Sequence, residues 1–336
     1  METLEKVKGW GAQEGMVKPN VNARQNAINT IRRNGLRQKL NYVKSHYLLY
    51  LMLLLPIAYY IVFHYRPMYG IVIAFKNYSI FKGIADSAWC GLQNFKKLFA
   101  IKEFSRAIVN TIRLNVLCLI FSFPAPILLA LMLNELKSRN FKKVTQTILY
   151  LPHFLSWVII GGLVSTLFAT NTGLINNALA SLGMNRIPWL SENKWWIVMY
   201  VLVSVWQSIG YGAIIYMSAM SSIDQEIYEA ARVDGCSRFK MMYLITLPSI
   251  KTTIVIMLIL KIGGMMSIGF EQPQMLKNAM VNDVGDVIST FIYRYGIQNA
   301  KHSLSTAAGL LQSVINFVLV MSANAVSRKI SDESIW

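Results

Sequence analysis

The segment EAARVDGCSRFKMMYLITLP, Glu229 to Pro248, lies between two long apolar segments and predicts a helix, a break and a second helix. Residues 229–232 are compatible with a helix. Asp234-Gly235 supplies the break, because glycine readily takes the left-handed conformation that ends a helix. Ser237 is placed to cap the next helix. The two alanines give the first helix a small-sided face that can approach another surface closely.

Outward from this segment, the chain holds six windows long and apolar enough to cross a bilayer, which takes about 20 mostly apolar residues. Hydrophobic residues make up 54% of the 336 positions and charged residues only 15%, against about a quarter charged in soluble domains. The windows are residues 46–65, 108–133, 148–169, 197–219, 250–270 and 306–326. The sequence therefore predicts an all-α integral membrane protein with six transmembrane helices.

The distribution of Lys and Arg predicts the orientation of these spans. Basic residues are dense in positions 1–45, in the short loop 137–143, in the quoted segment and in the last turn of the chain before residue 330. Both termini and these two loops are therefore expected in the cytoplasm, in a bacterial cell membrane. The bias is partial, because segment 66–106, expected outside, is also basic. The formal charge of +17 is attributed to topology and lipid contact rather than to nucleic acid.

The N-terminal 45 residues form a basic arm. Apolar residues recur at near-helical spacing between positions 28 and 43, which predicts an amphipathic helix on the inner membrane face. A disordered basic tail is an equal alternative for the first half of the arm. The first apolar stretch is long enough to span, so it is expected to stay as a signal anchor. The predicted organisation is an arm over 1–45, a six-span domain over 46–329 containing the loop 221–249, and a cytoplasmic tail over 330–336.

The quoted segment resembles the EAA motif of permease subunits of ABC importers. The spacing matches throughout: EAA, three residues, Gly235, nine residues, Ile245, one residue, then Leu247-Pro248. In that family the loop forms coupling helices that dock in a cleft of a cytoplasmic ATPase. The resemblance implies this role for Glu229, Ala230, Ala231, Asp234, Gly235, Leu247 and Pro248. An ordinary amphipathic hairpin joining two spans is the alternative.

Further segments resemble the carbohydrate branch of these permeases. They are residues 67–78, 262–272, 286–297 and 304–329, with Ile335-Trp336 at the end, so the likeness covers about residues 45–336. It implies the permease fold of type I ABC importers and an oligosaccharide as solute. It also implies a second homologous permease subunit, two ATPase subunits, an extracytoplasmic solute-binding protein and membrane lipid as partners.

The chain carries no motif that could power transport by itself. It has no G-x-x-x-x-G-K-[ST] phosphate loop, and its four histidines show no metal-ligand spacing. No nucleophile–base or paired-carboxylate arrangement is credible. We therefore expect no catalytic residue, metal or cofactor on this chain, with ATP and Mg²⁺ bound by the ATPase. His153, in an apolar run, is more typical of a packed histidine than of a proton relay.

Lys261 is the most unusual residue of the predicted spans, because a lysine at bilayer depth costs about 2.5–3.5 kcal/mol on insertion scales. At helical spacing it shares a face with residues nearer the outer end of its span: Gly264 or Met265, Ile268, and Glu271 or Gln272. It is either a contact for the solute, which could be a uronate, or a structural ion pair or carbonyl contact with another subunit. The sequence favours neither strongly.

Aromatic and amide side chains in the fourth window suit a sugar. Trp206 and Tyr211 offer flat apolar faces, and Gln207 can hydrogen-bond hydroxyl groups. Packing in the helix bundle is the alternative role for the two aromatic residues. The candidates for the solute pathway are Trp206, Gln207, Tyr211, Lys261, Phe270, Glu271 and Gln272.

Two other classes of protein were weighed against an importer permease. An ion- or proton-coupled secondary transporter should show acidic or histidine relays inside its spans and inverted repeats. Windows two to six carry almost no carboxylate, and no convincing repeat is visible. A non-transporting membrane scaffold would not need the EAA spacing. The sequence therefore favours a permease that forms half of the pathway of an ATP-driven oligosaccharide importer, with the identity of the sugar left open.

Overall fold

The structure is a computed structural model that describes Tyr42 and residues 44–331. The predicted amphipathic helix before residue 45 falls almost entirely outside the described residues, as do residues 332–336. The chain divides between Tyr69 and Gly70 into two compact units.

The first unit holds the first candidate span. Its helix runs through α3 (Tyr47–Tyr60), a π-helical turn η1 (Ile61–Tyr65) and α4 (Arg66–Met68), and the 3₁₀ helix η2 (Tyr69–Phe75) follows. The predicted window 46–65 is confirmed, and the span extends beyond it to Phe75. No residue of its apolar window is buried within the chain. This helix is apolar on all sides, which is typical of a membrane-spanning segment.

The second unit opens with a β-hairpin that the sequence analysis did not predict. Strands β1 (Lys76–Ser79) and β2 (Gly83–Trp89) pair antiparallel, with Lys76 opposite Trp89. The hairpin is fixed to the start of helix α19 (His302–Ser331), because the Ser303 hydroxyl donates to the carbonyl oxygen of Lys76 over 2.8 Å. The described part of the protein is therefore mostly helical with one two-stranded sheet.

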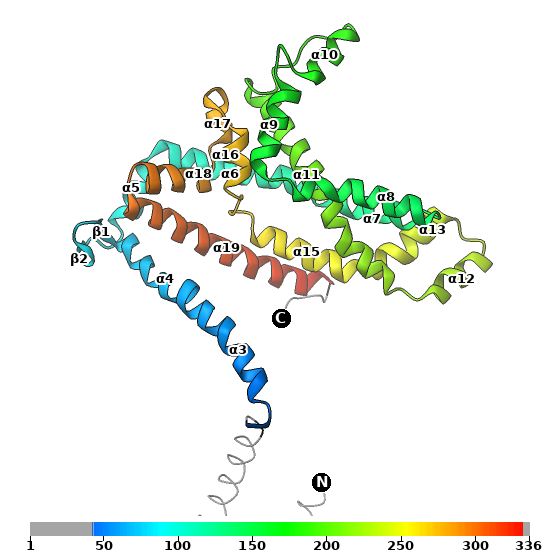
Figure 1. The fold of residues 1–336 in the computed structure, drawn as a ribbon, viewed down its shortest axis with the longest axis horizontal. Helices are drawn as coiled ribbons and strands as arrows, with labels where there is room; N and C mark the ends of the chain where they lie inside the picture. The colour runs from blue at the N-terminus through cyan, green and yellow to red at the C-terminus, as the bar shows by residue number, and fades with distance from the viewer. Residues whose placement is uncertain (1–41, 43, 332–336) are drawn as a thin grey trace, which may run out of the picture. The chain divides into compact units, whose positions relative to one another are not determined.

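The other elements of this unit are helices. In chain order they are α5 (Gln93–Ala100), α6 (Lys102–Ser122), α7 (Pro124–Asn134), α8 (Arg139–Tyr150), η3 (Leu151–Phe154), α9 (Trp157–Phe168), α10 (Leu174–Ser181), α11 (Asn193–Ser221), α12 (Gln225–Val233), α13 (Arg238–Met241), η4 (Met242–Thr246), α14 (Leu247–Ser249), α15 (Lys251–Gly263), α16 (Glu271–Leu276), η5 (Ala279–Val281), α17 (Asn282–Gly285), α18 (Ile288–Tyr293) and η6 (Arg294–Gln298). Helix α11 packs against α6, α7 and α8, and α15 packs against α19 (Figure 1).

Among the described residues, four helical stretches could each cross a membrane alone, and two bent pairs raise the number to six. The windows 108–133, 197–219 and 306–326 are confirmed by the stretches Lys102–Asn134, Asn193–Ser221 and His302–Lys329. The third and fifth windows coincide with the two bent pairs, which agrees with six predicted spans, although neither window is one continuous helix. The third bends by 101° between Phe154 and Trp157.

The bend in the third window has a local cause. Proline lacks the backbone N–H that a continuing helix needs, and Pro152 is the second residue of the 3₁₀ turn η3. Ser156 then starts a new helix, because its side chain accepts a hydrogen bond from the Ile159 N–H over 3.4 Å. Two helices therefore replace one, with the amphipathic α8 before the bend and the apolar α9 after it.

The helix in the fifth window differs from the predicted span at both ends. It is preceded by a 61° bend between Ser249 and Lys251, and this helix, α15, stops at Gly263 instead of continuing to Phe270. A Cβ atom on Gly263 would lie 2.1 Å from Cγ2 of Val320, so this glycine lets α15 approach α19 closely. We call residues 264–270, which follow without forming an α-helix, the unwound segment.

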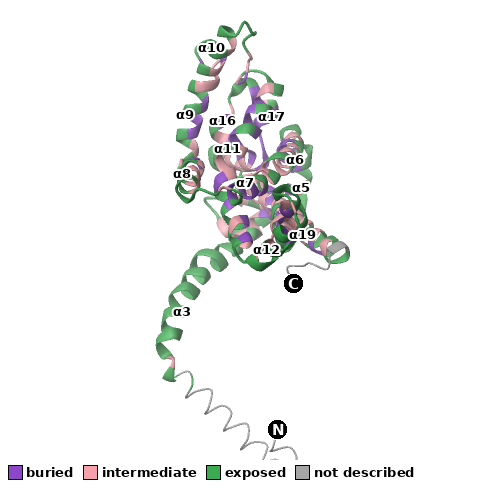
Figure 2. Cartoon of the chain, turned by 90° about the vertical axis from the view of Figure 1, so that its right-hand side faces the viewer, coloured by how far each residue is buried: buried purple, intermediate pink, exposed green. Residues whose placement is uncertain are grey.

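The largest buried side chains lie where α11 meets its neighbours. Trp196 and Tyr200 of α11 are almost fully buried, and the Trp196 indole N–H donates to the carbonyl oxygen of Leu276 over 2.9 Å. Figure 2 shows buried residues along α11, α16 and α17, whereas α3 is exposed throughout. This packing positions both candidate sites described below, because each is lined by residues of α11.

Candidate functional site

The segment from Glu229 to Pro248 forms the helix, break and helix that its sequence predicts. Asp224 begins α12 by accepting a hydrogen bond from the Glu226 N–H over 3.0 Å. The helix ends in a Schellman motif. Gly235 has φ +73°, its N–H donates to the Arg232 carbonyl oxygen over 3.1 Å, and the Cys236 N–H donates to the Ala231 carbonyl oxygen over 2.9 Å.

The second arm of the loop starts where the sequence places its cap. The Ser237 side chain accepts a hydrogen bond from the Lys240 N–H over 3.4 Å, which begins α13. A π-helical turn, η4, continues this arm into α14, where Pro248 occupies the first turn. Proline has no backbone N–H with which to continue the helix, and the helical path bends shortly after Pro248, between Ser249 and Lys251.

The two arms of the loop are fastened together. The hydroxyl groups of Tyr228 on α12 and Thr246 on η4 hydrogen-bond to each other over 2.8 Å. Ala231 is buried, whereas Glu229 and Ala230 on the same helix are exposed. The motif therefore has two sides. Ala231 lies on the side that packs against the chain itself, and Glu229 and Ala230 lie on the exposed side.

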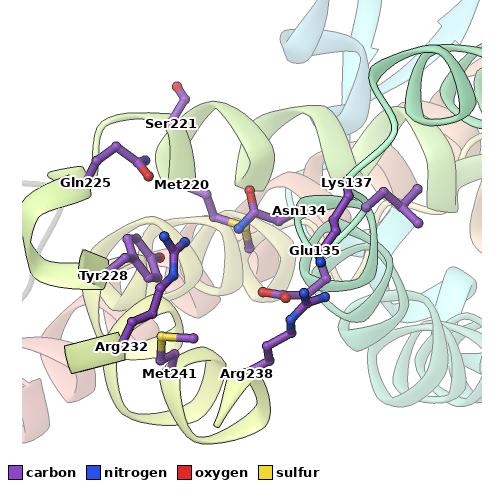
Figure 3. A pocket seen from close by; sticks show the side chains of 11 residues that line it. Asn134, Glu135, Lys137, Met220, Ser221, Gln225, Tyr228, Arg232, Arg238 and Met241 are labelled. Carbon is purple, nitrogen blue, oxygen red and sulfur yellow. The ribbon is translucent and has the colours of Figure 1, made fainter. Parts of the chain in front are cut away.

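A cavity of about 710 Å³ opens between this loop and the connection from α7 to α8. Figure 3 shows Arg232 from α12 and Arg238 from α13 directed into it, with Glu135 of the α7–α8 connection on the opposite side. The sequence analysis did not connect Glu135 and Lys137 with the coupling loop. The distribution of Lys and Arg could have indicated this proximity, because it predicts that the α7–α8 connection and the coupling loop lie on the same side of the membrane.

A second, smaller cavity of about 200 Å³ lies between the spans. Its lining is almost entirely polar and comes from α6, α11, α15, the unwound segment and α16: Asn115, Cys118, Ser122, Tyr200, Ser204, Gln207, Ser208, Lys261, Ser267, Ile268, Gly269 and Gln272. Three predicted pathway residues, Gln207, Lys261 and Gln272, are thus brought together. The helical face predicted to join Lys261 to residues 264–272 is wrong, because α15 ends at Gly263. Gln272 reaches the cavity because the chain changes direction in the unwound segment after Gly263.

Side chains from two spans hold the backbone of the unwound segment. Asn115 Nδ2 donates to the Met265 carbonyl oxygen over 2.5 Å. Gln312 Nε2 donates to the Met266 carbonyl oxygen over 2.6 Å, and the Met266 N–H donates to Asn316 Oδ1 over 3.0 Å. Non-helical backbone at membrane depth requires such hydrogen-bond partners. These side chains therefore stabilise the non-helical conformation of the unwound segment.

The other predicted pathway residues lie elsewhere. Trp206 lines a separate apolar groove between α6 and α11. Tyr211 stacks on His153 with ring centroids 3.9 Å apart, and Phe270 lies against Tyr293 at 4.7 Å. Glu271 is exposed in the first turn of α16. None of the four lines the polar cavity.

Several lining residues were missed by sequence reasoning. Asn115, Cys118 and Ser122 follow one another at spacings of three and four in an apolar window, as do Ser204 and Gln207. Residues with this spacing share one face of a helix. A search for polar residues at helical spacing within each apolar window would therefore have found both walls of the cavity.

A buried charge network fixes the segment between α17 and α18. Asp286 is completely buried and lies 2.7 Å from Arg294 and 3.2 Å from Lys277. Its carboxylate also accepts a hydrogen bond from the Thr290 hydroxyl over 2.7 Å. Burial alone would raise the pKa of Asp286, but the hydrogen bonds from Arg294 and Thr290 and the nearby charges outweigh it and lower that pKa below its ordinary value.

Comparison with known proteins matches these features to one family. The model of the family described as "Binding-protein-dependent transport system inner membrane component" matches residues 122–332. Protein LplB of Bacillus subtilis (strain 168) is 41% identical over 288 residues, which cover 86% of this chain and 91% of that protein. The polygalacturonan/rhamnogalacturonan transport system permease protein YteP of the same organism is 42% identical over 288 residues, covering 86% and 90%.

Two solved structures share the fold. One is a bacterial ABC transporter involved in the import of the acidic polysaccharide alginate, with a TM-score of 0.80 and 41% identity over 88% of this chain and 99% of that chain. The other is the bacterial alginate ABC transporter in complex with an alginate pentasaccharide-bound periplasmic protein, with a TM-score of 0.80 and 41% identity over 87% and 98%.

These findings confirm the predicted class of protein, and nothing in them supports the alternative of an ion-coupled secondary transporter. The family match covers more than half of the chain and includes the whole coupling loop. The chain therefore belongs to the family of binding-protein-dependent transport system inner membrane components, as a membrane-embedded permease subunit of an ABC importer.

Proposed function

We propose that this subunit forms half of the translocation pathway for an oligosaccharide and couples it to ATP hydrolysis through the loop 221–249. The observation that carries the coupling assignment is the exposed Glu229–Ala230 surface on a helix whose other side is fastened to the chain. The sugar as solute is supported by the relatives, which take part in the transport of polygalacturonan, rhamnogalacturonan and alginate.

The loop has the rigidity that coupling requires. The Tyr228–Thr246 hydrogen bond joins α12 to η4, and η4 runs through α14 directly toward α15. A displacement of α12 by an ATPase would therefore be transmitted to the fifth span instead of being lost in loop motion. ATP and Mg²⁺ would be bound by two ATPase subunits and not by this chain.

In the proposed assembly, the coupling loop and both termini would lie in the cytoplasm, and the β-hairpin would lie outside. A second homologous permease would complete the pathway, and an extracytoplasmic solute-binding protein would deliver the sugar. The distribution of Lys and Arg supports this orientation, because basic residues occur in segment 137–143 and in the coupling loop, and both regions border one cavity.

The decisive experiment compares charge reversals on α12 in the complete transporter reconstituted in vesicles. Glu229→Lys should uncouple uptake from ATP hydrolysis, because it reverses the charge on the docking surface. Loss of one docking hot spot costs about 2 kcal/mol, or roughly a 30-fold loss of affinity. Glu226→Lys is the matched control, since Glu226 is exposed on the same helix outside the motif. Measurements are sugar-dependent uptake and ATPase stimulation by loaded binding protein.

Gly235→Val tests the same assignment through the backbone. A β-branched residue is strained at φ +73°, although open space surrounds the site. Gly183→Val introduces the same strain at φ +75°, also in open space and outside the coupling loop. We expect only Gly235→Val to lower coupled uptake. Full coupling in both Glu229→Lys and Gly235→Val would refute the coupling role of the loop.

A further inference from the structure

We propose that the polar cavity around Lys261 binds a carboxylate group of the transported oligosaccharide, and that Lys261 sets the preference for acidic over neutral sugars. This inference rests on the proposed function, because it assigns the cavity to the solute pathway. It goes beyond that function by naming the chemical group that is recognised and the residues that recognise it.

The charge of the lining is the first argument. Lys261 is the charged member of twelve lining residues, and none of the twelve is an aspartate or glutamate. Lys261 is also not part of any of the three ion pairs among the described residues. An ammonium group at bilayer depth is costly unless an anion, carbonyl groups or water compensate it. The cavity therefore has a cation in place and lacks the anion that would pair with it.

The backbone beside Lys261 is the second argument. The unwound segment follows Lys261 by three residues, and Ser267, Ile268 and Gly269 of this segment line the cavity. Non-helical backbone at membrane depth is tolerated where it is buried in protein or lines a water-filled cavity. In transporters, discontinuous helices of this kind form solute sites. The unwound segment is held in its non-helical conformation by hydrogen bonds to Asn115, Gln312 and Asn316. The site is therefore formed before a solute binds.

Neutral polar groups in the cavity suit sugar hydroxyls. Gln207 makes no hydrogen bond to any described residue, and the hydroxyl of Ser122 is buried without a partner. Gln272 and Ser204, in contrast, are fixed by a hydrogen bond to each other. At about 200 Å³ the cavity is smaller than the roughly 300–1,000 Å³ of pockets for drug-sized ligands. It therefore fits a single sugar unit of a longer chain.

Cys118 lines the same cavity and provides a direct reporter. In the complete transporter carrying Cys90→Ser and Cys236→Ser, we would measure how fast Cys118 reacts with two methanethiosulfonates of similar size. One carries a sulfonate group and the other a trimethylammonium group. Lys261→Met should lower the ratio of the anionic to the cationic rate about fivefold, because it removes a positive charge from the cavity that Cys118 also lines. Lys261→Arg should preserve the ratio.

Lys251→Met is the matched control for that measurement. Lys251 begins the same helix about 15 Å away, so its loss should leave the rate ratio unchanged. An unchanged ratio in Lys261→Met as well would overturn the proposal, because Lys261 would then not set the potential of the cavity.

Protection of Cys118 tests the chemical class of the solute without requiring transport. Galacturonic acid trimer at about nine times its Kd should slow the modification about tenfold, since the free site falls by a factor of 1 + [L]/Kd. The neutral galactose trimer should not protect, and Lys261→Met should abolish protection by the acidic trimer. Equal protection by both trimers, or protection by neither, would overturn the carboxylate assignment.

Transport measurements separate this inference from the proposed function. If wild-type transporter shows no ATPase stimulation by any loaded binding protein, the proposed function fails. If stimulation is normal but Lys261→Met lowers the yield of assembled complex and affects all sugars alike, Lys261 is a structural contact between subunits and only the present inference fails. Normal assembly together with selective loss of acidic sugars supports it.

Discussion

At the scale of single residues, Asp286 shows how a buried charge is stabilised. Its carboxylate is fully buried, yet Arg294, Lys277 and Thr290 supply two cations and a hydroxyl donor within 3.2 Å. Breaking such an arrangement by removing one partner is expensive, because the remaining charges stay buried without compensation. Asp286 therefore anchors the chain between α17 and α18.

We predict that Asp286→Asn destabilises the protein by about 3–5 kcal/mol at neutral pH. The pKa of Asp286 is lowered in the folded state, so its contribution is complete above the unfolded-state pKa of about 3.9. That contribution is lost as the pH falls through the folded-state pKa. The difference in thermal stability between wild type and variant, measured in detergent, should therefore shrink as the pH falls below about 4.

Asp283→Asn is the control for this prediction. Asp283 pairs with Arg106, but their side chains are 65% and 40% exposed, and exposed pairs contribute about 1 kcal/mol or less. If both substitutions cost the same, the buried network would not be the source of stability.

At the scale of elements, the contact between α15 and α19 depends on one glycine. Gly263 is buried, and a Cβ atom there would lie 2.1 Å from Cγ2 of Val320. Real Cβ atoms do not approach other atoms this closely, so a larger residue must push the helices apart. The same contact positions the unwound segment, which begins at the next residue and is held by Gln312 and Asn316 of α19.

We predict that Gly263→Ala lowers the stability of the assembled transporter by about 1–3 kcal/mol, the usual cost of overpacking. Val320→Ala should restore part of this loss in the double variant, because it removes the atom that clashes. Gly162→Ala is the control, since Gly162 lies in helix α9 with open space around its Cα. Thermal unfolding in detergent provides the measurement, and independent, additive effects of Gly263→Ala and Val320→Ala would contradict the contact.

At the scale of the whole molecule, orientation in the membrane decides which partner each end meets. Phe81, at the tip of the β-hairpin, is 100% exposed, and Val233, at the end of α12, is 88% exposed. Both positions are therefore suited to chemical labelling. In the proposed orientation, Phe81 lies outside and Val233 lies in the cytoplasm.

We predict that Phe81→Cys reacts with a membrane-impermeant maleimide in intact spheroplasts, and that Val233→Cys reacts only after permeabilisation. The background carries Ser at positions 90, 118 and 236, so that each introduced thiol reports alone. Lys137→Cys, in the α7–α8 connection, should behave like Val233→Cys because both connections border one cavity. Labelling of Val233→Cys in intact spheroplasts would contradict the orientation and the docking of an ATPase on α12.

The sequence by itself determined what depends on neighbouring residues. Apolar windows located all six spans, because the cost of placing polar groups in a bilayer adds up along a short stretch. Asp234-Gly235 and Ser237 predicted the break and the cap of the coupling loop, because backbone conformation and capping act within a few positions.

Only the tertiary structure decided what depends on residues far apart in the chain. The close approach of Gly263 to Val320 joins α15 to α19, and Asn115, Gln312 and Asn316 hold the unwound segment. Those partners lie tens to more than a hundred residues away, where no local pattern reveals them. The hydropathy of a segment determines whether it enters the membrane. The contacts between segments decide where its helix bends or unwinds, and therefore which polar side chains meet around Lys261.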